Sequence, residues 1–321
     1  MKILLAEKKK YSGGFFVNAP VLTFWENGMD NYKLANIIVQ WDGGGFEFAK
    51  GNYMERFRCN AVDEIELIRF RGRFVSLKAY TGFPIKTENS MYALFDIHGE
   101  RLVIYHWGHS RFAFAIWPDR IRADRTNECW FDPDMIHQPQ LNADWFFGVS
   151  GLHKALLMRG AAIIHASYVE KNGQGILFTA PSGTGKSTQA SLWNSYIGAN
   201  IVNGDRVLVR KWKECWQGFG YPCCGSSRIC LNKAFPLRAI VAIQQGEKNH
   251  IEEMSASQKI RTLAAAIEVY PWDTEEIQRA LDIAESLAEE VSVVHLICRP
   301  DQEAVEVLSH YLEVEDYATG I

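Results

Sequence analysis

The sequence predicts an α/β protein in two domains: a mainly antiparallel β domain over residues 1–140 and a mixed-sheet α/β domain over residues 141–321. Two observations support this division. Between Phe57 and Trp117, apolar and polar residues alternate with a period of two, as they do in half-buried strands. Beyond residue 140, short apolar runs alternate with segments of helical spacing, which is typical of a sheet covered by helices.

The composition is that of a soluble globular protein. Of 321 residues, 47% are hydrophobic and 22% are charged, which excludes disordered and collagen-like classes. A formal net charge of -4 gives no reason to expect nucleic acid as a partner. The first residues, MKILLAEKKK, lack a signal-peptide core, and no stretch reaches the roughly 18 apolar residues of a membrane span. We therefore expect a cytoplasmic protein that does not bind membranes.

In the first domain the alternation predicts two strands with apolar faces. These faces consist of Val75, Leu77 and Ala79 in one strand, and of Phe112, Phe114 and Ile116 in the other. Between them, the segment MYALFDIHGERLVIYHW is expected to form a hairpin that turns at residues 98–100. The sequence of this domain indicates no function.

The second domain opens with a predicted helix over LNADWFFGVSGLHKALLMRG, where apolar residues from Trp145 to Leu156 fall at helical spacing. Asn142 can cap its start and Gly160 can end it. Further strands are expected over residues 162–169, 175–179, 200–202, 207–209, 237–243 and 291–298. Further helices are expected over residues 187–196 and 300–312, and after the capping pairs Ser255 with Gln258 and Asp273 with Glu276.

The loop APSGTGKS has the Walker A spacing, with Ala180 where glycine is commoner. It lies between a predicted strand and a predicted helix, which is the context that this motif requires. A short polar turn joins that strand to the one before it, which implies an antiparallel hairpin leading into the loop. Gly183 and Gly185 allow successive backbone N–H groups to point inward, and the helix start adds its unpaired amides. We therefore expect ATP, or another nucleoside triphosphate, to bind here with Mg²⁺.

Individual roles follow from the motif. Lys186 is expected to reach the β and γ phosphates, and Ser187 to supply a hydroxyl to Mg²⁺. Thr188 either caps the helix or supports the nucleotide. The expected nucleotide-binding residues are Ser182, Gly183, Thr184, Gly185, Lys186, Ser187 and Thr188.

Two further features narrow the reaction class. The sequence lacks the NKxD motif with which GTPases read guanine and the LSGGQ signature of transporter ATPases. A carboxylate, Asp205, follows the predicted strand 200–202, at the carboxyl end of a strand expected to neighbour the loop. Sheets of this kind bind their ligands at that end.

These residues resemble a known family. IIHASYVEKNGQGILFTAPSGTGKST followed by GANIVNGDRVLV is similar to the core of HPr kinase/phosphorylase and of ATP-dependent phosphoenolpyruvate carboxykinase. The segments YPCCGSSRICLN and PLRAIVAI resemble bacterial HPr-kinase-like proteins, and some relatives act on ribosomal peptides as serine kinases. The resemblance covers roughly residues 145–310 and implies the mixed-sheet P-loop kinase fold of the HPr kinase/phosphoenolpyruvate carboxykinase type.

The resemblance also implies site residues. His165 matches a family histidine that lies beside the γ phosphate as a metal ligand or hydrogen-bond donor. Asp205 matches the second aspartate of a pair that divides metal binding and proton abstraction, and Gly204 stands at the first position. Asp205 is therefore expected to combine the two roles, with Lys186 as the third catalytic residue. Arg228 either holds a phosphate or an acidic acceptor, or is an ordinary surface arginine.

The expected function is a Mg²⁺- and nucleotide-dependent kinase that transfers the γ-phosphoryl group to a hydroxyl. The expected acceptor is a serine of a peptide or small protein. Two alternatives stay open. One is a phosphoenolpyruvate carboxykinase-like enzyme. The other is a nucleotide-binding regulatory or scaffold protein with degraded catalysis, because Gly204 replaces the first aspartate. A homo-oligomer is possible, since the related kinase assembles as a hexamer.

Overall fold

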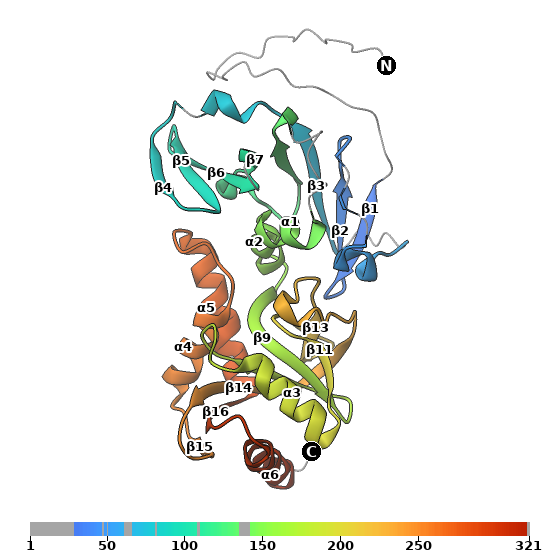
Figure 1. Cartoon of the computed structure of the whole chain (residues 1–321), viewed down its shortest axis with the longest axis vertical. Helices are drawn as coiled ribbons and strands as arrows, with labels where there is room; N and C mark the ends of the chain where they lie inside the picture. Colours follow the sequence, from blue (N-terminus) through green and yellow to red (C-terminus); the bar gives the residue numbers. More distant parts are fainter. Residues whose placement is uncertain are drawn as a thin grey trace. The chain divides into compact units, whose positions relative to one another are not determined.

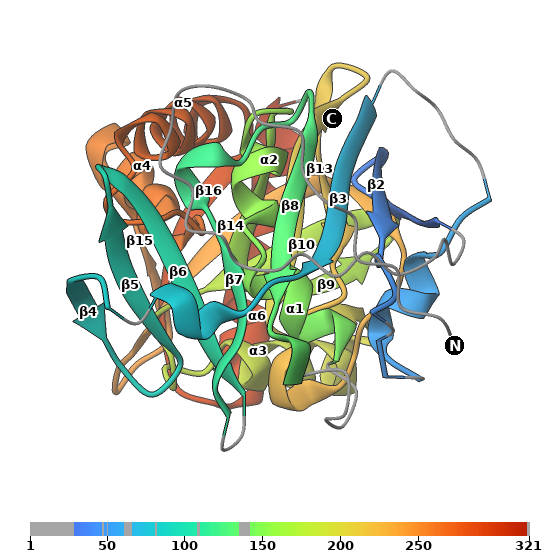
Figure 2. The same cartoon turned by 90° about the horizontal axis from the view of Figure 1, so that it is seen from above.

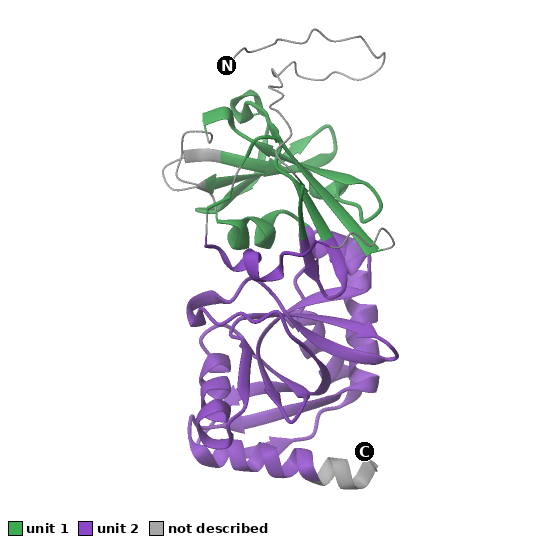
Figure 3. Ribbon diagram, turned by 90° about the vertical axis from the view of Figure 1, so that its right-hand side faces the viewer, with its two compact units in different colours: residues 1–31, 39–50, 61–151 green, residues 32–38, 51–60, 152–321 purple. Residues whose placement is uncertain are grey.

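The computed structural model describes residues 29–46, 48–49, 51–60, 66–80, 82–107, 110–134 and 142–319 (Figure 1). The chain divides into two compact units, drawn in different colours in Figure 3. The second unit comprises residues 32–38, 51–60 and 152–321, and the first comprises the remainder. The division expected at residue 140 stays a prediction, and the segment MKILLAEKKK lies outside the described residues.

The first unit contains most of an eight-stranded sheet, in the order β1-β2-β3-β8-β7-β6-β5-β4, and residues 32–38 around the β1-β2 turn belong to the second unit. The strands are β1 (Asp30–Leu34), β2 (Ile37–Asp42), β3 (Leu67–Phe74), β4 (Ile85–Glu88), β5 (Tyr92–Ile97), β6 (Glu100–Trp107), β7 (Ser110–Ile116) and β8 (Thr126–Phe131). Strands β4 to β8 pair antiparallel in succession, but β3 pairs parallel with β8. The chain forms β4 to β7 before β8 returns beside β3, and no local pattern reveals such a crossover.

The expected strand through Val75, Leu77 and Ala79 is wrong. Residues Leu77–Tyr80 form a 3₁₀ helix, although Val75 and Leu77 are both buried. The N–H of Leu77 donates to the carboxylate of Asp132 at 2.9 Å, so a side chain takes the place of a neighbouring strand. The other expected strand is confirmed as β7. The expected hairpin is also present: β5 and β6 pair antiparallel and are joined by a turn at His98 and Gly99, which have positive φ.

Aromatic side chains form much of the core of the first unit. The ring of Phe46 stacks on that of Phe131 with centroids 4.1 Å apart, and Phe146 and Phe147 of α1 (Ala143–Val149) pack against the same cluster. Asn142 caps α1 by accepting a hydrogen bond from the N–H of Asp144. Most of the rings are fully buried, so α1 is fixed by apolar burial as well as by its cap.

The single helix expected from Asn142 to Gly160 is two helices. The first is α1, and the second is α2 (Leu152–Leu157). Gly151 between them has φ +78°, a left-handed conformation that ends a helix. Gly151 therefore ends α1 in the middle of the predicted helix, although apolar residues continue at helical spacing beyond it.

The second unit contains a sheet of mixed direction, in the order β10-β9-β12-β13-β14-β16-β15, with β11 paired to β9. Its strands are β9 (Ala161–Lys171), β10 (Gln174–Thr179), β11 (Asn200–Asn203), β12 (Arg206–Trp212), β13 (Cys215–Gly220), β14 (Ala234–Gln245), β15 (His250–Glu252) and β16 (Ser292–Cys298). The predicted strands of this region are all present, and β9 and β10 form the expected antiparallel hairpin. The expected α/β class with a mixed sheet is confirmed. Strands β13 and β15 were not expected.

Five strands of this sheet close on one another. Strand β14 pairs antiparallel with β13 through residues 234–236 and parallel with β10 through residues 237–242. Because β10, β9, β12 and β13 already pair in that order, the five strands form a closed ring of neighbours. The carboxyl end of β10 and the start of β12 lie on the two strands that flank β9.

Helices cover both faces of the sheet. They are α3 (Lys186–Ile197), α4 (Ala256–Ala266), α5 (Thr274–Glu290) and α6 (Gln302–Thr319). On one face α4 and α5 lie side by side (Figures 1 and 2), and Leu287 of α5 packs in the cluster that contains Ile164 of β9. On the other face Trp193 of α3 and Leu308 of α6 pack in a cluster with Phe178 of β10. In the part of the chain that the structure describes, no helix is both long and apolar enough to cross a membrane.

A buried group of charges fixes α2 to the start of α5. The ammonium of Lys154 lies 2.5 Å from the carboxylate of Asp273 and 3.9 Å from that of Glu276, and the imidazole of His153 lies 3.3 Å from Glu276. Asp273 also caps α5, whereas Glu276 accepts from the N–H of Tyr270, so the expected capping box is only half formed. Burial alone would raise the pKa of Asp273, but hydrogen bonds from Lys154 and the cap hold it below its usual range.

We predict that Asp273→Asn destabilises the protein by about 3 kcal/mol, because Lys154 loses its closest counter-charge in a buried site. The native pKa of Asp273 lies below its unfolded value of about 3.9, so its contribution is present above that pH and is lost as pH falls through the native pKa. The difference between wild type and variant should therefore shrink in acid. Urea denaturation across this pH range measures it.

Glu275→Gln is the matched control, since Glu275 lies in the same turn but pairs with Arg279 on the surface. It should change the free energy of unfolding by less than about 0.5 kcal/mol. Equal midpoints for wild type and Asp273→Asn at neutral pH would show that the buried pair does not hold α5.

Candidate active site

The loop between β10 and α3 depends on the backbone freedom of two glycines. Gly183 has φ +80° and Gly185 has φ +122°, and a Cβ on either would meet nothing within 4 Å. Glycine is therefore required here by backbone conformation and not by crowding. Helix α3 begins at Lys186 without a side-chain cap, so its N-cap residue, Gly185, accepts no hydrogen bond from the amides of the first turn through a side chain. Such a loop can accept an anion through its backbone.

Lys186 folds back over this loop. Its ammonium donates to the carbonyls of Ala180 at 2.9 Å and Pro181 at 3.3 Å, and the residue is only 7% exposed. Burial lowers the pKa of Lys186, and the nearby carboxylate of Asp205 partly opposes this. The ammonium is thus held partly desolvated against two carbonyls, where it can pair with an anion in the loop.

The side chains of His165 and Asp205 lie together. The Nε2 of His165, on β9, is 3.2 Å from Oδ1 of Asp205, which lies between β11 and β12. The backbone carbonyl of Asp205 accepts from the N–H of Ala166 at 3.0 Å. Both side chains remain partly exposed, at 42% and 29%, so a substrate can reach them.

Ser187 joins the loop to this pair. Its hydroxyl donates to the carbonyl of Gly204 at 3.3 Å, and the hydroxyl of Ser167 on β9 donates to the same carbonyl at 2.9 Å. Gly204 immediately precedes Asp205. The structure therefore brings Lys186, Ser187, His165 and Asp205 to one place, whereas Ser182 and Thr188 lie exposed on the loop and helix.

Asn203 is a positioning residue that sequence reasoning missed. It is fully buried, and its side-chain oxygen accepts from the N–H of Asp205 at 2.9 Å and of Arg206 at 3.1 Å. Its amide nitrogen donates to the carbonyl of Tyr221 at 2.5 Å. An Asn two residues before a turn carboxylate is the sequence signal of such an Asx turn.

Asp205 also lies beside a second ion pair. The guanidinium of Arg206 is 3.9 Å from Asp205 and 3.4 Å from Glu268, which sequence reasoning did not identify. Burial would lower the pKa of Arg206, but Glu268 and the other groups around it raise it. Arg206 is thus a permanent positive charge next to the Asp205 carboxylate.

A turn at residues 223–228 packs directly on this carboxylate. A Cβ on Gly225 would lie 3.0 Å from Cβ and Cγ of Asp205, and a Cβ on Gly204 would lie 2.0 Å from Oγ of Ser227. The hydroxyl of Ser227 donates to the carbonyl of Cys224 at 2.7 Å and so closes the turn. The space beside Gly204, where a first aspartate would extend, is therefore filled by Ser227. The exposed Arg228 ends the turn with φ +56°.

A cavity of about 420 Å³ adjoins the loop. Loop and helix residues, among them Gly183 and Gln189, form one side of it, and Gln245, Cys298 and Arg299 form the other. The side chain of Gln245 donates to the carbonyl of Thr184 at 3.2 Å and links β14 to the loop. The volume lies within the range of small-molecule sites.

The donor set near the loop suits a hard cation. Ser187 offers a hydroxyl oxygen and Asp205 a carboxylate, and Mg²⁺ characteristically takes one or two protein oxygens together with phosphate oxygens and water. Among the described residues there is no group of three or more His, Cys, Asp or Glu side chains that could hold a metal ion unaided. The residues present therefore fit Mg²⁺ only as part of a phosphate complex.

Comparisons with known proteins give only distant likenesses, and these are to solved structures. No family model matches the sequence, and no curated protein matches it. Among solved structures, the HPr(Ser) kinase/phosphatase from Coxiella burnetii aligns with 13% sequence identity and a TM-score of 0.29. The alignment covers 49% of this chain and 95% of that one.

We predict that Gly204→Ala destabilises the protein by about 2 kcal/mol, because its Cβ would overlap Ser227. In a Ser227→Gly background, which removes both overlapping atoms, the same substitution should cost much less. Thermal unfolding of the four proteins of this double-mutant cycle measures the coupling.

Gly82→Ala serves as control, since a Cβ there meets nothing within 4 Å, and it should be neutral within about 0.5 kcal/mol. A cost for Gly204→Ala that is the same in both backgrounds would mean that Ser227 is not what excludes a side chain at position 204.

Proposed function

We propose that the protein is a nucleotide- and Mg²⁺-dependent kinase that transfers a γ-phosphoryl group to a hydroxyl, on a serine of a peptide or small protein. The observation that supports this most directly is the convergence of Lys186, Ser187, His165 and Asp205 beside a glycine-rich loop. These groups supply an anion cradle, a metal ligand and a carboxylate base within one site.

In this proposal the nucleotide phosphates lie in the loop. The backbone amides around Gly183 and Gly185 and the start of α3 bind phosphate oxygens, and Lys186 exchanges its two carbonyl contacts for the β and γ phosphates. Moving a partly desolvated ammonium from neutral carbonyls to a polyanion strengthens its electrostatic interaction. The cavity beside the loop accommodates the rest of the nucleotide.

Ser187 and Asp205 would hold Mg²⁺, which neutralises charge on the transferring phosphoryl group. Asp205 accepts the proton of the acceptor hydroxyl while the oxygen of that hydroxyl forms a bond to the γ phosphorus. At the same time the bond between the γ phosphorus and the β-γ bridging oxygen breaks. His165, 3.2 Å from Asp205, orients the carboxylate or donates to a phosphate oxygen. Because Gly204 offers no second carboxylate, Asp205 combines the roles of base and metal ligand.

One observation favours the alternative of a nucleotide-binding regulatory or scaffold protein. The position before Asp205 cannot carry a side chain without displacing Ser227, so the site has a single carboxylate beside the loop. If one carboxylate does not suffice for both roles, nucleotide would bind without turnover. Measuring binding and turnover on the same protein separates the two functions.

Lys186→Ala is expected to weaken MgATP binding by at least tenfold, because it removes the ammonium group that lies against the carbonyls of the glycine-rich loop. Isothermal titration calorimetry measures this, with Lys248→Ala as a control on an exposed lysine outside the site. Equal affinities for wild type and Lys186→Ala, with either ATP or GTP, would argue against a phosphate cradle in this loop.

Asp205→Asn is expected to lower turnover by at least tenfold while MgATP affinity stays within about threefold, since general-base catalysis contributes typically 10²–10⁴. Turnover is followed as ATP hydrolysis and as transfer to a seryl peptide library. Asp282→Asn, on the surface of α5, is the matched control. Unchanged turnover in Asp205→Asn would reject Asp205 as the base, and MgATP binding without turnover in wild type would favour the scaffold function.

A further inference from the structure

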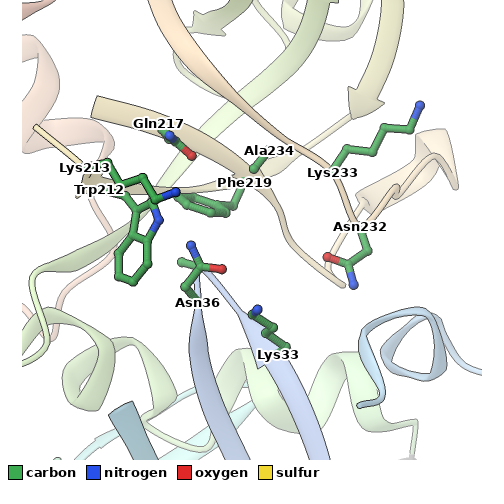
Figure 4. Close-up of a pocket in the computed structure, with 10 residues that line it drawn as sticks. Lys33, Asn36, Trp212, Lys213, Gln217, Phe219, Asn232, Lys233 and Ala234 are labelled. Atoms are coloured by element: carbon green, nitrogen blue, oxygen red, sulfur yellow. The ribbon is translucent and has the colours of Figure 1, made fainter. Parts of the chain in front are cut away.

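A second cavity, of about 390 Å³, lies in the second unit and shares no lining residue with the cavity beside the loop. It lies between the β1-β2 turn, the β12-β13 hairpin and the start of β14 (Figure 4). Strand β12 connects it to the candidate active site, from Arg206 beside Asp205 to Trp212 in the cavity. At about 3.3 Å per residue, the two ends of β12 are about 20 Å apart.

The lining of this cavity is basic. Lys33, Lys213 and Lys233 are among the ten lining residues, and none of the ten is acidic, although the whole chain has a net charge of -4. In Figure 4 the amino groups of Lys33 and Lys213 turn toward the cavity, whereas that of Lys233 points away. Two ammonium groups that face one concave space favour an anion within it.

Two aromatic side chains give the cavity an apolar wall. Phe219 is buried, and Trp212 is half-buried beside it (Figure 4). The side chains of Asn36 and Gln217 add polar groups to the lining. A cavity lined by both cations and flat aromatic rings suits a ligand that has an anionic group on a planar body.

A buried arginine fixes these walls to one another. Arg210 is 7% exposed, its guanidinium lies 5.3 Å from the centroid of the Trp212 ring, and it donates to the carbonyl of Ala35 at 3.1 Å. It thus connects the indole wall to the β1-β2 turn and adds a third positive charge behind the indole. The cavity is therefore built by a specific buried contact.

The backbone around the cavity is held in uncommon conformations. Ala35, Asn36, Lys213 and Glu214 have φ between +49° and +66°, and they are four of the seven non-glycine residues with positive φ in the described chain. They form the two turns that border the cavity, without a glycine in either. Side chains other than Asn or Asp cost roughly 1–2 kcal/mol in this region, and such conformations gather at binding sites.

We propose that this cavity binds a small organic anion that carries a phosphate or carboxylate group on an aromatic or conjugated ring. Lys33 and Lys213 pair with the anionic group, and Trp212 and Phe219 pack against the ring. The site is separate from the candidate active site and does not depend on the function proposed for it.

Saturation-transfer NMR and calorimetry with four probes test this: phenyl phosphate, benzoate, inorganic phosphate and benzyl alcohol. Phenyl phosphate or benzoate should bind at least tenfold more tightly than both the bare anion and the neutral ring, and the better of the two identifies the anionic group. Lys33→Gln combined with Lys213→Gln should weaken this binding at least tenfold, and Trp212→Leu should weaken it for the ring probes only. Both lysines are exposed, so the double lysine variant should keep the thermal midpoint of wild type.

Two control variants make the result specific. Lys233→Gln should have at most a threefold effect, because its amino group points away from the cavity. Lys186→Ala should leave binding of the ring probes unchanged. Binding that Lys186→Ala abolishes and the double lysine variant retains would assign the anion to the glycine-rich loop and overturn the proposal. Failure of both ring anions to bind more tightly than benzyl alcohol would overturn it as well.

Discussion

The carbonyl oxygen of Gly204 is the point on which the candidate active site depends. It accepts the hydroxyl of Ser167 from β9 and the hydroxyl of Ser187 from α3, so one backbone atom joins the strand that carries His165 to the helix that follows the loop. The next residue is Asp205. Any shift of this carbonyl would move the carboxylate relative to the loop. Asn203 and the turn at residues 223–228 pack against Gly204 and Asp205 and so limit such a shift.

Patterns of nearby residues in the sequence were sufficient to predict the elements whose structure those same residues determine. The β9-β10 hairpin, the glycine-rich loop and α3 follow from apolar runs and glycines within about 35 residues of sequence, and they were predicted to within a few residues. The 3₁₀ helix at Leu77 was not, because Asp132, 55 residues away, supplies its hydrogen bond. The parallel pairing of β3 with β8 likewise depends on a distant return of the chain.

The same distinction applies to the site. Lys186, Ser187, His165 and Asp205 could be proposed from motifs, and the structure places them together, although their roles stay predictions. The groups that sequence reasoning missed act on the backbone of their neighbours. Asn203, Ser167 and Ser227 bind carbonyls or amides whose partners are decided only when strands pair and turns close. Asn203 at least stands where an Asx turn can be expected, but an ordinary Ser in a sequence carries no mark of such a contact.

The closed ring of β10, β9, β12, β13 and β14 has a consequence for how the molecule opens. Each of these strands has a hydrogen-bonded neighbour on both sides, so none can separate from the sheet without breaking two ladders at once. Strands β11 and β15 are each held by a single ladder. Amide hydrogens of the ring should therefore exchange with solvent only through global unfolding. Peripheral segments such as β11 and β15 should unfold locally without disturbing the strand that carries His165.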